Sequence, residues 1–400
     1  MKIRTGVTIP KNFIAGGTNC GIKANGGLDL AIIMSTVPSV AWGVFTKNRV
    51  VGAPVTVSKN RLRSKHISGI VINSGNSNTL TETGLFDANT MANAAANAVG
   101  EKLGRFLVAS TGIIGQPLPI KSILQEMDNL ANVLGPYGGK SAAKAIMTTD
   151  SVSKESSKRI KLGLSTVSVG GCAKGSGMIH PNMGTMLAFI TTDAAIKKPV
   201  LKEIVKRVNQ ESFSRITVDG DTSTSDMLII MANGASGAKT IEKPKGKLFG
   251  KLLEAVIEVA VNLAKMIVRD GEGATKFATV RVEDAVSEGD AKKASVAIAK
   301  SNLVKTALFG QDPNWGRILA SAGYSGAKID IRKATLKING VIIYKKGKLA
   351  SQDWEGKVAS KMRLKEILIE LNLGLGKSSW EIWTCDLSQD YIRINADYRT

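Results

Sequence analysis

The segment with the most unusual composition in this chain approaches a threonine through a run of glycines. Residues 170–185 read Gly-Gly-Cys-Ala-Lys-Gly-Ser-Gly-Met-Ile-His-Pro-Asn-Met-Gly-Thr, and an apolar stretch follows. Glycine lets a backbone approach another group closely or take angles that other residues avoid. Such a junction suits attack by the Thr185 hydroxyl on the carbonyl carbon of Gly184, and hydrolysis of the resulting ester would free Thr185 as a new N-terminus.

A threonine that carries its own α-amine is both nucleophile and base, and it needs no histidine. The unperturbed pKa of an α-amine, about 7.7–8.0, lies near the pH at which this group must accept a proton. The chain has only two histidines, His66 and His180, and neither accompanies a Gly-x-Ser-x-Gly nucleophile motif. From the residues alone, a glycine-rich turn before a buried strand is the favoured interpretation of the segment.

Composition narrows the class of protein. The 400 residues include 43% hydrophobic and 22% charged residues, which excludes disorder, and no uninterrupted apolar run is long enough to span a membrane. The net charge of +21 is spread along the chain and aromatic residues make up only 5%, so we do not expect a nucleic-acid partner. Three dispersed cysteines predict neither disulfides nor a zinc site, and we expect no metal. The sequence predicts a soluble, cytoplasmic protein.

Hydrophobic periodicity predicts a mixed α/β fold. Short apolar or alternating runs indicate strands at 31–34, 42–45, 69–72, 160–169 and 186–191. Ala-rich or amphipathic patterns indicate helices at 87–103, 119–133, 199–213 and 252–268. After Gly273 the pattern changes to strand, helix and strand. We therefore expect a catalytic domain over 1–280, with layered sheets and helices around Thr185, and a smaller C-terminal α/β domain over 281–400.

Ordered blocks along nearly the whole chain resemble the ornithine acetyltransferase family, the bifunctional glutamate N-acetyltransferases of arginine biosynthesis. The segment ending in Gly184-Thr185 resembles the cleavage and nucleophile motif of that family. Eight further blocks match in order, at 43–55, 73–78, 110–115, 146–150, 218–226, 269–276, 312–317 and 391–400. Two positions depart from the family pattern. Gly184 replaces the usual Ala, and because Gly is smaller and freer we expect cleavage to persist; Ser77 replaces a common Ala in what we expect to be a buried loop.

The resemblance implies a role for individual residues. Thr185 would be the nucleophile, and Thr111 with Gly112 would form the oxyanion hole. The remaining matches are substrate-binding positions, in which a lysine suits a carboxylate, a glutamate suits the ornithine ammonium, and Asn or Thr orient a carboxylate without adding charge. These positions are Thr148, Lys174, Thr185, Glu272, Asn395 and Thr400.

The reaction that the resemblance implies is a two-step acetyl transfer. Thr185 would take the acetyl group from N2-acetylornithine and release ornithine, and the amine of glutamate would then attack the ester to give N-acetylglutamate. Acetyl-CoA is a possible second donor, and no cofactor is needed. Cleavage would give an α chain of residues 1–184 and a β chain of residues 185–400, assembled as an α2β2 heterotetramer. The alternative is a self-processing aminopeptidase or amidohydrolase of similar architecture.

Overall fold

The computed structural model describes residues 3–180 and 186–397, and it divides the chain into two compact units. Unit 1 consists of residues up to Ser214 together with Asp221–Ile267, and unit 2 of Arg215–Gly220 together with the chain from Val268 onward. The boundary expected near residue 280 falls inside a strand of unit 2. The glycines at 271 and 273 follow α6 (Lys247–Arg269), the helix that begins in unit 1. The change of sequence pattern used to predict the boundary therefore comes after the point at which unit 2 begins.

Unit 1 contains two sheets that pack face to face. The first has the order β1-β2-β4-β5, in which β4 and β5 run parallel and the other pairs antiparallel. Its strands are β1 (Phe13–Thr18), β2 (Leu30–Ser35), β4 (Gly69–Asn76) and β5 (Phe106–Ile113). The second has the order β3-β9-β8-β7-β6, with β8 and β9 parallel. Its strands are β3 (Val40–Phe45), β6 (Lys154–Leu162), β7 (Ser165–Lys174), β8 (Leu187–Thr192) and β9 (Met227–Ala232).

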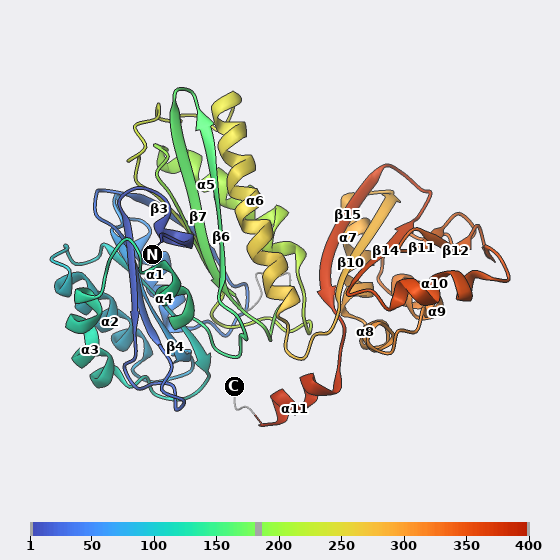
Figure 1. Ribbon diagram of the computed structural model, residues 1–400, viewed down its shortest axis with the longest axis horizontal. Coiled ribbons are helices and arrows are strands. Elements are labelled where there is room, and N and C mark those ends of the chain that lie inside the picture. The colour runs from blue at the N-terminus through green and yellow to red at the C-terminus, as the bar shows by residue number, and fades with distance from the viewer. Residues whose placement is uncertain (1–2, 181–185, 398–400) are drawn as a thin grey trace. The chain divides into compact units, whose positions relative to one another are not determined.

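One hydrophobic cluster fills the space between these sheets. Ile72 and Leu107 from the first sheet pack in the same cluster as Phe189 and Ile229 from the second. Alternate residues on β2, β4 and β5 point to the opposite face of the first sheet and pack against α2 and α3 in another cluster. Helix α6 lies along the second sheet (Figure 1), where Glu258 pairs with Lys158 at 2.9 Å. The layered α/β architecture predicted from the sequence is confirmed for this unit.

The helices of unit 1 follow from local sequence signals. They are α1 (Ala53–Arg61), α2 (Gly84–Ala98), α3 (Ile120–Asn132), α4 (Gly139–Ala145), α5 (Lys198–Glu211) and α6 (Lys247–Arg269), with 3-10 turns at Gly6–Thr8 and Phe213–Arg215. Proline in the first turn starts α1 and α5, because the missing N–H has no partner there in any case. Helix α1 was not predicted, since its β-branched residues are typical of a strand.

One predicted strand is wrong. Residues 160–169 do not form a single strand, because the chain reverses at Gly163 between β6 and β7. Gly163 has a φ of 66°, a left-handed conformation that glycine takes without strain. The alternating pattern continues through this turn, and so the sequence reads as one strand where the structure has an antiparallel hairpin. This hairpin brings Lys154 opposite Ala173, the residue before Lys174.

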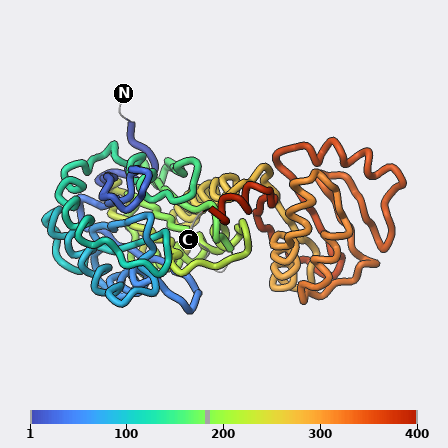
Figure 2. The backbone as a smooth tube through the Cα atoms, turned by 90° about the horizontal axis from the view of Figure 1, so that it is seen from below, coloured from blue at the N-terminus to red at the C-terminus, as the bar shows by residue number. Residues whose placement is uncertain are grey.

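Unit 2 is a six-stranded sheet with helices on one face. Its strand order is β13-β12-β11-β14-β10-β15. The strands are β10 (Phe277–Ala285), β11 (Thr335–Ile338), β12 (Val341–Lys345), β13 (Lys348–Leu349), β14 (Glu366–Asn372) and β15 (Ser378–Cys385). The helices are α7 (Glu288–Lys300), α8 (Asn302–Phe309), α9 (Trp315–Gly323), α10 (Trp354–Met362) and α11 (Gln389–Asp397). In Figure 2 the strands and helices of this unit are the segments coloured from orange to red.

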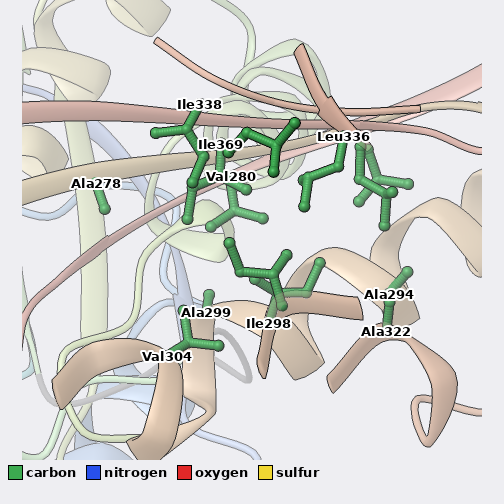
Figure 3. Packing of buried hydrophobic residues seen from close by; sticks show 14 of the residues in the cluster. Ala278, Val280, Ala294, Ile298, Ala299, Val304, Ala322, Leu336, Ile338 and Ile369 are labelled. Carbon is green, nitrogen blue, oxygen red and sulfur yellow. The ribbon is translucent and has the colours of Figure 1, made fainter. Parts of the chain in front are cut away.

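The core of unit 2 lies between the sheet and its helices. Figure 3 shows Val280 of β10 and Ile369 of β14 facing Ile298 of α7, all of them buried. The other face of β10 is polar, with Arg281 bonded to Glu381 at 2.7 Å. Unit 2 therefore has its own hydrophobic core, as the smaller C-terminal α/β domain of the prediction requires.

Candidate active site

Three of the predicted site residues meet where two strands of unit 1 end. Thr111 lies near the end of β5, on the face that carries Leu107 and Ala109 toward the second sheet, and Lys174 is the last residue of β7. The Lys174 Nζ donates to Thr148 Oγ1 at 2.7 Å and to Thr111 Oγ1 at 3.3 Å. Thr111 and Lys174 are each only 3% exposed. The arrangement is a buried ammonium group flanked by two hydroxyls.

Gly112 occupies a position that no other residue could fill without a shift of the backbone. Its φ is 130°, and a Cβ atom built there would lie 2.3 Å from the carbonyl carbon of Gly75. Gly75 is its partner in the parallel ladder, and Asn76 opposes both Thr111 and Ile113, so the register shifts at this point. The irregularity in the ladder therefore falls at the predicted oxyanion-hole position.

Asp150 organises the residues around Lys174. Its Oδ1 accepts hydrogen bonds from Lys154 Nζ at 2.6 Å and from the Gly175 N–H at 2.7 Å, and its Oδ2 accepts from the Thr148 N–H at 3.0 Å. Burial alone would raise the pKa of this carboxyl, but the positive charges of Lys174 and Lys154 and its hydrogen bonds lower the pKa to about 2. Asp150 is therefore ionised, and it fixes the backbone on both sides of the Lys174 ammonium.

A second buried carboxyl, Asp226, lies beside the residue that follows the predicted nucleophile. Its Oδ1 accepts from the Met186 N–H at 3.1 Å, and its Oδ2 is buried without a hydrogen-bond partner among residues 3–180 and 186–397. Burial raises the pKa of Asp226 well above the usual value, although the Met186 N–H, the Thr46 hydroxyl and the charge of Lys174 act in the opposite direction. Burial therefore acts against the charged form of Asp226, in contrast to Asp150, whose charge is stabilised by its partners.

Residues 73–78 comprise the end of β4 and the start of the loop that follows it, and their polar side chains hold this part of the fold together. Asn76 donates through Nδ2 to the carbonyl oxygens of Gln116 and Pro117, both at 3.1 Å, and its Oδ1 accepts from the Asn78 N–H. Ser77 is 2% exposed, and its hydroxyl donates to the Ile113 carbonyl oxygen at 2.8 Å. The expectation of a buried loop is correct, and Ser77 adds a hydrogen bond to the end of β5.

The remaining predicted site residues are placed elsewhere or not described. In unit 2, Asn395 on α11 donates through Nδ2 to Glu272 Oε2 at 2.8 Å, so these two predicted binding residues are in contact. Gly184, Thr185 and Thr400 lie outside the described residues, and so does the bond whose cleavage is predicted.

Sequence reasoning assigned no role to Asp150 or Asp226, although both lie in family-like blocks. Asp150 is bonded to the nearby Thr148 and Lys154 as well as to the distant Gly175, and Asp226 is bonded to the distant Met186. Among the residues that the structure describes, no group of three His, Cys, Asp or Glu side chains could hold a metal ion. In the same residues, no helix is long and apolar enough to cross a membrane.

Comparison with known proteins gives consistent matches. The ArgJ family profile matches residues 14–400. The arginine biosynthesis bifunctional protein ArgJ of Symbiobacterium thermophilum is 45% identical over 99% of this chain and 98% of its own length. The ArgJ of Geobacter sulfurreducens is 44% identical over 98% and 99%. The crystal structure of ArgJ from Bacillus halodurans aligns with a TM-score of 0.50 and 37% identity, covering 52% of this chain and 98% of the crystallised chain.

Proposed function

The chain belongs to the ArgJ family, and on that premise we propose that it transfers the acetyl group of N2-acetylornithine to glutamate through an acetyl ester on Thr185. The products are ornithine and N-acetylglutamate, intermediates of arginine biosynthesis. The observation that carries the proposal is the contact of the Lys174 ammonium with both Thr148 and Thr111. It joins a predicted carboxylate-binding cation to a predicted oxyanion-hole hydroxyl in one buried network.

The direction of these hydrogen bonds suits catalysis. Because the Lys174 ammonium can only donate, the oxygen of Thr111 accepts and its own proton remains available to another acceptor. That proton can stabilise the oxyanion that forms when a nucleophile attacks the acetyl carbonyl. The Gly112 N–H would be the second donor. One donor of this kind typically contributes about 2.7–4 kcal/mol of transition-state stabilisation.

The chemical steps then balance without a metal or redox cofactor. The Thr185 oxygen attacks the acetyl carbon while the Thr185 α-amine takes the hydroxyl proton. The C–N bond to ornithine breaks as its nitrogen receives that proton, and the acetyl ester remains. The amine of glutamate next attacks the ester carbon, gives up a proton, and restores the Thr185 hydroxyl. Acetyl-CoA could load the same ester, with the thiol as leaving group.

Glu272 and Asn395 are proposed to bind the ornithine ammonium. The Asn395 amide donates to one oxygen of the Glu272 carboxylate, which orients that carboxylate while adding no charge. Glu272 is 9% exposed, and a carboxylate with so little access to water attracts a cation more strongly than an exposed one. Thr400 is proposed as a further substrate contact.

The proposal includes self-cleavage between Gly184 and Thr185, into an α chain of residues 1–184 and a β chain of residues 185–400 that assemble as α2β2 in the cytoplasm. The length of the matched Bacillus halodurans chain supports it. Nearly all of that chain aligns with about half of this one, as expected for one product of a cut near the middle.

The test is a product assay with purified protein and N2-acetylornithine, with and without glutamate. Formation of N-acetylglutamate in step with ornithine release supports the proposal. Ornithine and acetate in equal amounts, with no acetylation of glutamate, would instead identify an amidohydrolase. Replacing N2-acetylornithine by acetyl-CoA in the same assay determines whether the chain is bifunctional.

A further inference from the structure

Lys23 lies on a loop that is fixed against the candidate site. The Asp29 carboxylate accepts hydrogen bonds from the backbone N–H groups of Cys20 at 2.7 Å, Ile22 at 2.7 Å and Lys23 at 3.0 Å. The Asp29 carbonyl oxygen accepts from the Ser74 N–H at 2.8 Å, which joins the loop to β4. Asp29 is fully buried, so the backbone position of Lys23 is determined by the fold.

The side chain of Lys23 lies beside Gly75, near the end of β4. A Cβ atom built on Gly75 would lie 3.4 Å from Lys23 Cγ, and Gly75 is the ladder partner of Gly112. The Lys23 Nζ donates to the Leu28 carbonyl oxygen at 2.6 Å. Within residues 3–180 and 186–397 this is its only hydrogen-bond acceptor, so an ammonium with three protons uses one of them.

The charges around Lys23 favour an anion. Burial lowers the pKa of Lys23, the carboxylates of Asp29 and Asp150 raise it, and the ammonium of Lys174 lowers it further, so the two ammonium groups lie within range of each other's charge. The Asp150 carboxylate is already paired with Lys154 at 2.6 Å. Each of the two carboxylates accepts three hydrogen bonds, and within the described residues neither forms an ion pair with the Lys23 ammonium.

The two substrates of the proposed reaction differ in the number of carboxylates that an ammonium group could bind. N2-acetylornithine has one carboxylate and a cationic side chain, whereas glutamate has two carboxylates. Lys174 is assigned to the α-carboxylate, which both substrates share. Resting on the proposed function, we propose that Lys23 binds the side-chain carboxylate of glutamate and selects the acceptor in the second half of the reaction.

The test separates the two half-reactions in Lys23→Met, which removes the charge but keeps an unbranched stem against Gly75. The first half-reaction is followed as ornithine released from N2-acetylornithine before glutamate is added, and the second as acetylation of glutamate or glutamine. We expect kcat/KM for glutamate to fall by at least about tenfold, the loss that one charge-assisted hydrogen bond brings. The rate for glutamine, which lacks the side-chain carboxylate, and the ornithine burst should change little. Lys23→Arg should recover part of the preference for glutamate.

The matched control is Lys102→Met, at an exposed lysine of the same unit. An equal fall for glutamate and glutamine, an equal fall in both half-reactions, or no change in any of them would overturn the inference. The wild-type protein separates this failure from failure of the proposed function. If the wild-type chain released no ornithine and acetylated no glutamate, the proposed function would be at fault rather than the role of Lys23.

Discussion

In unit 1 the ammonium of Lys174 is buried between two strand ends and bonded to two threonines, whereas in unit 2 Glu272 is held by Asn395, an exposed residue on the last helix. The residues of the first arrangement lie on β5 of one sheet and β7 of the other, so their positions are fixed by the packing of these sheets. The second depends on α11, which has no buried residue. We infer that unit 1 contributes preorganised chemistry and that unit 2 contributes affinity, so substitutions in the two units should have different sizes and different kinetic signatures.

The largest effect should come from Thr185→Ala. Without the hydroxyl, neither the attack on Gly184 nor the acetyl ester can form, so the chain should remain a single polypeptide and lose at least about a thousandfold in kcat. Intact-mass analysis and the acetyl-transfer assay measure the two effects. Thr185→Ser keeps a hydroxyl and should still be cut. An uncut but fully active wild-type protein would contradict the mechanism, because Thr185 would then have no free amine.

Asp150→Asn should produce the next largest effect, on stability. It leaves the Lys154 ammonium, which is 0% exposed, without its carboxylate, and breaking a buried ion pair from one side costs about 3–5 kcal/mol. Urea unfolding measures this. The control is the double variant Asp150→Asn with Lys154→Met, which removes both charges and should be less destabilised than the single variant. If the two were equally unstable, the ion pair would not be the cause.

The low pKa of Asp150 predicts that the free energy of unfolding depends on pH in the acid range. The pKa of Asp150 is about 2 in the folded chain against an ordinary value near 3.8, so its contribution is complete above about pH 4 and is lost as the pH falls through about 2. The loss should amount to about 2 kcal/mol. Unfolding free energies measured across this range should show an acid-dependent component in the wild-type chain that Asp150→Asn lacks.

Lys174→Met tests the catalytic side of the comparison. Removing the ammonium takes away the proposed carboxylate contact and leaves the Thr111 hydroxyl free to turn, so kcat/KM should fall by about tenfold to a hundredfold for both half-reactions. The joint loss distinguishes Lys174 from Lys23, whose replacement should impair only the acceptor step. Lys174→Arg retains the charge and should retain more activity than the Met variant. A change confined to one half-reaction would contradict the shared role.

The sequence predicted the strands of unit 1 where apolar runs are short and bounded by polar residues, as at 31–34, and the long helix at 252–268 where the amphipathic pattern persists. It did not predict the β6–β7 hairpin, because the alternation continues across Gly163. The network around Lys174 depends on that hairpin, which brings Lys154 opposite Ala173. Thr111, Thr148 and Lys174 could therefore be named from family-like motifs, while the hydrogen bond between Asp150 and the Gly175 N–H needed the pairing of β6 with β7.

The smallest effect should come from Asn395→Ala, which tests the affinity side of the comparison. The Asn395 amide orients Glu272 through one hydrogen bond of 2.8 Å at an exposed position, and such a bond contributes about 1 kcal/mol. The KM for N2-acetylornithine should rise by about fivefold with little change in kcat, because α11 supports binding and not the reacting groups. Glu272→Gln, which removes the charge itself, should raise the same KM further. A fall in kcat with an unchanged KM for Asn395→Ala would assign unit 2 a part in the chemistry and would contradict the division between the two units.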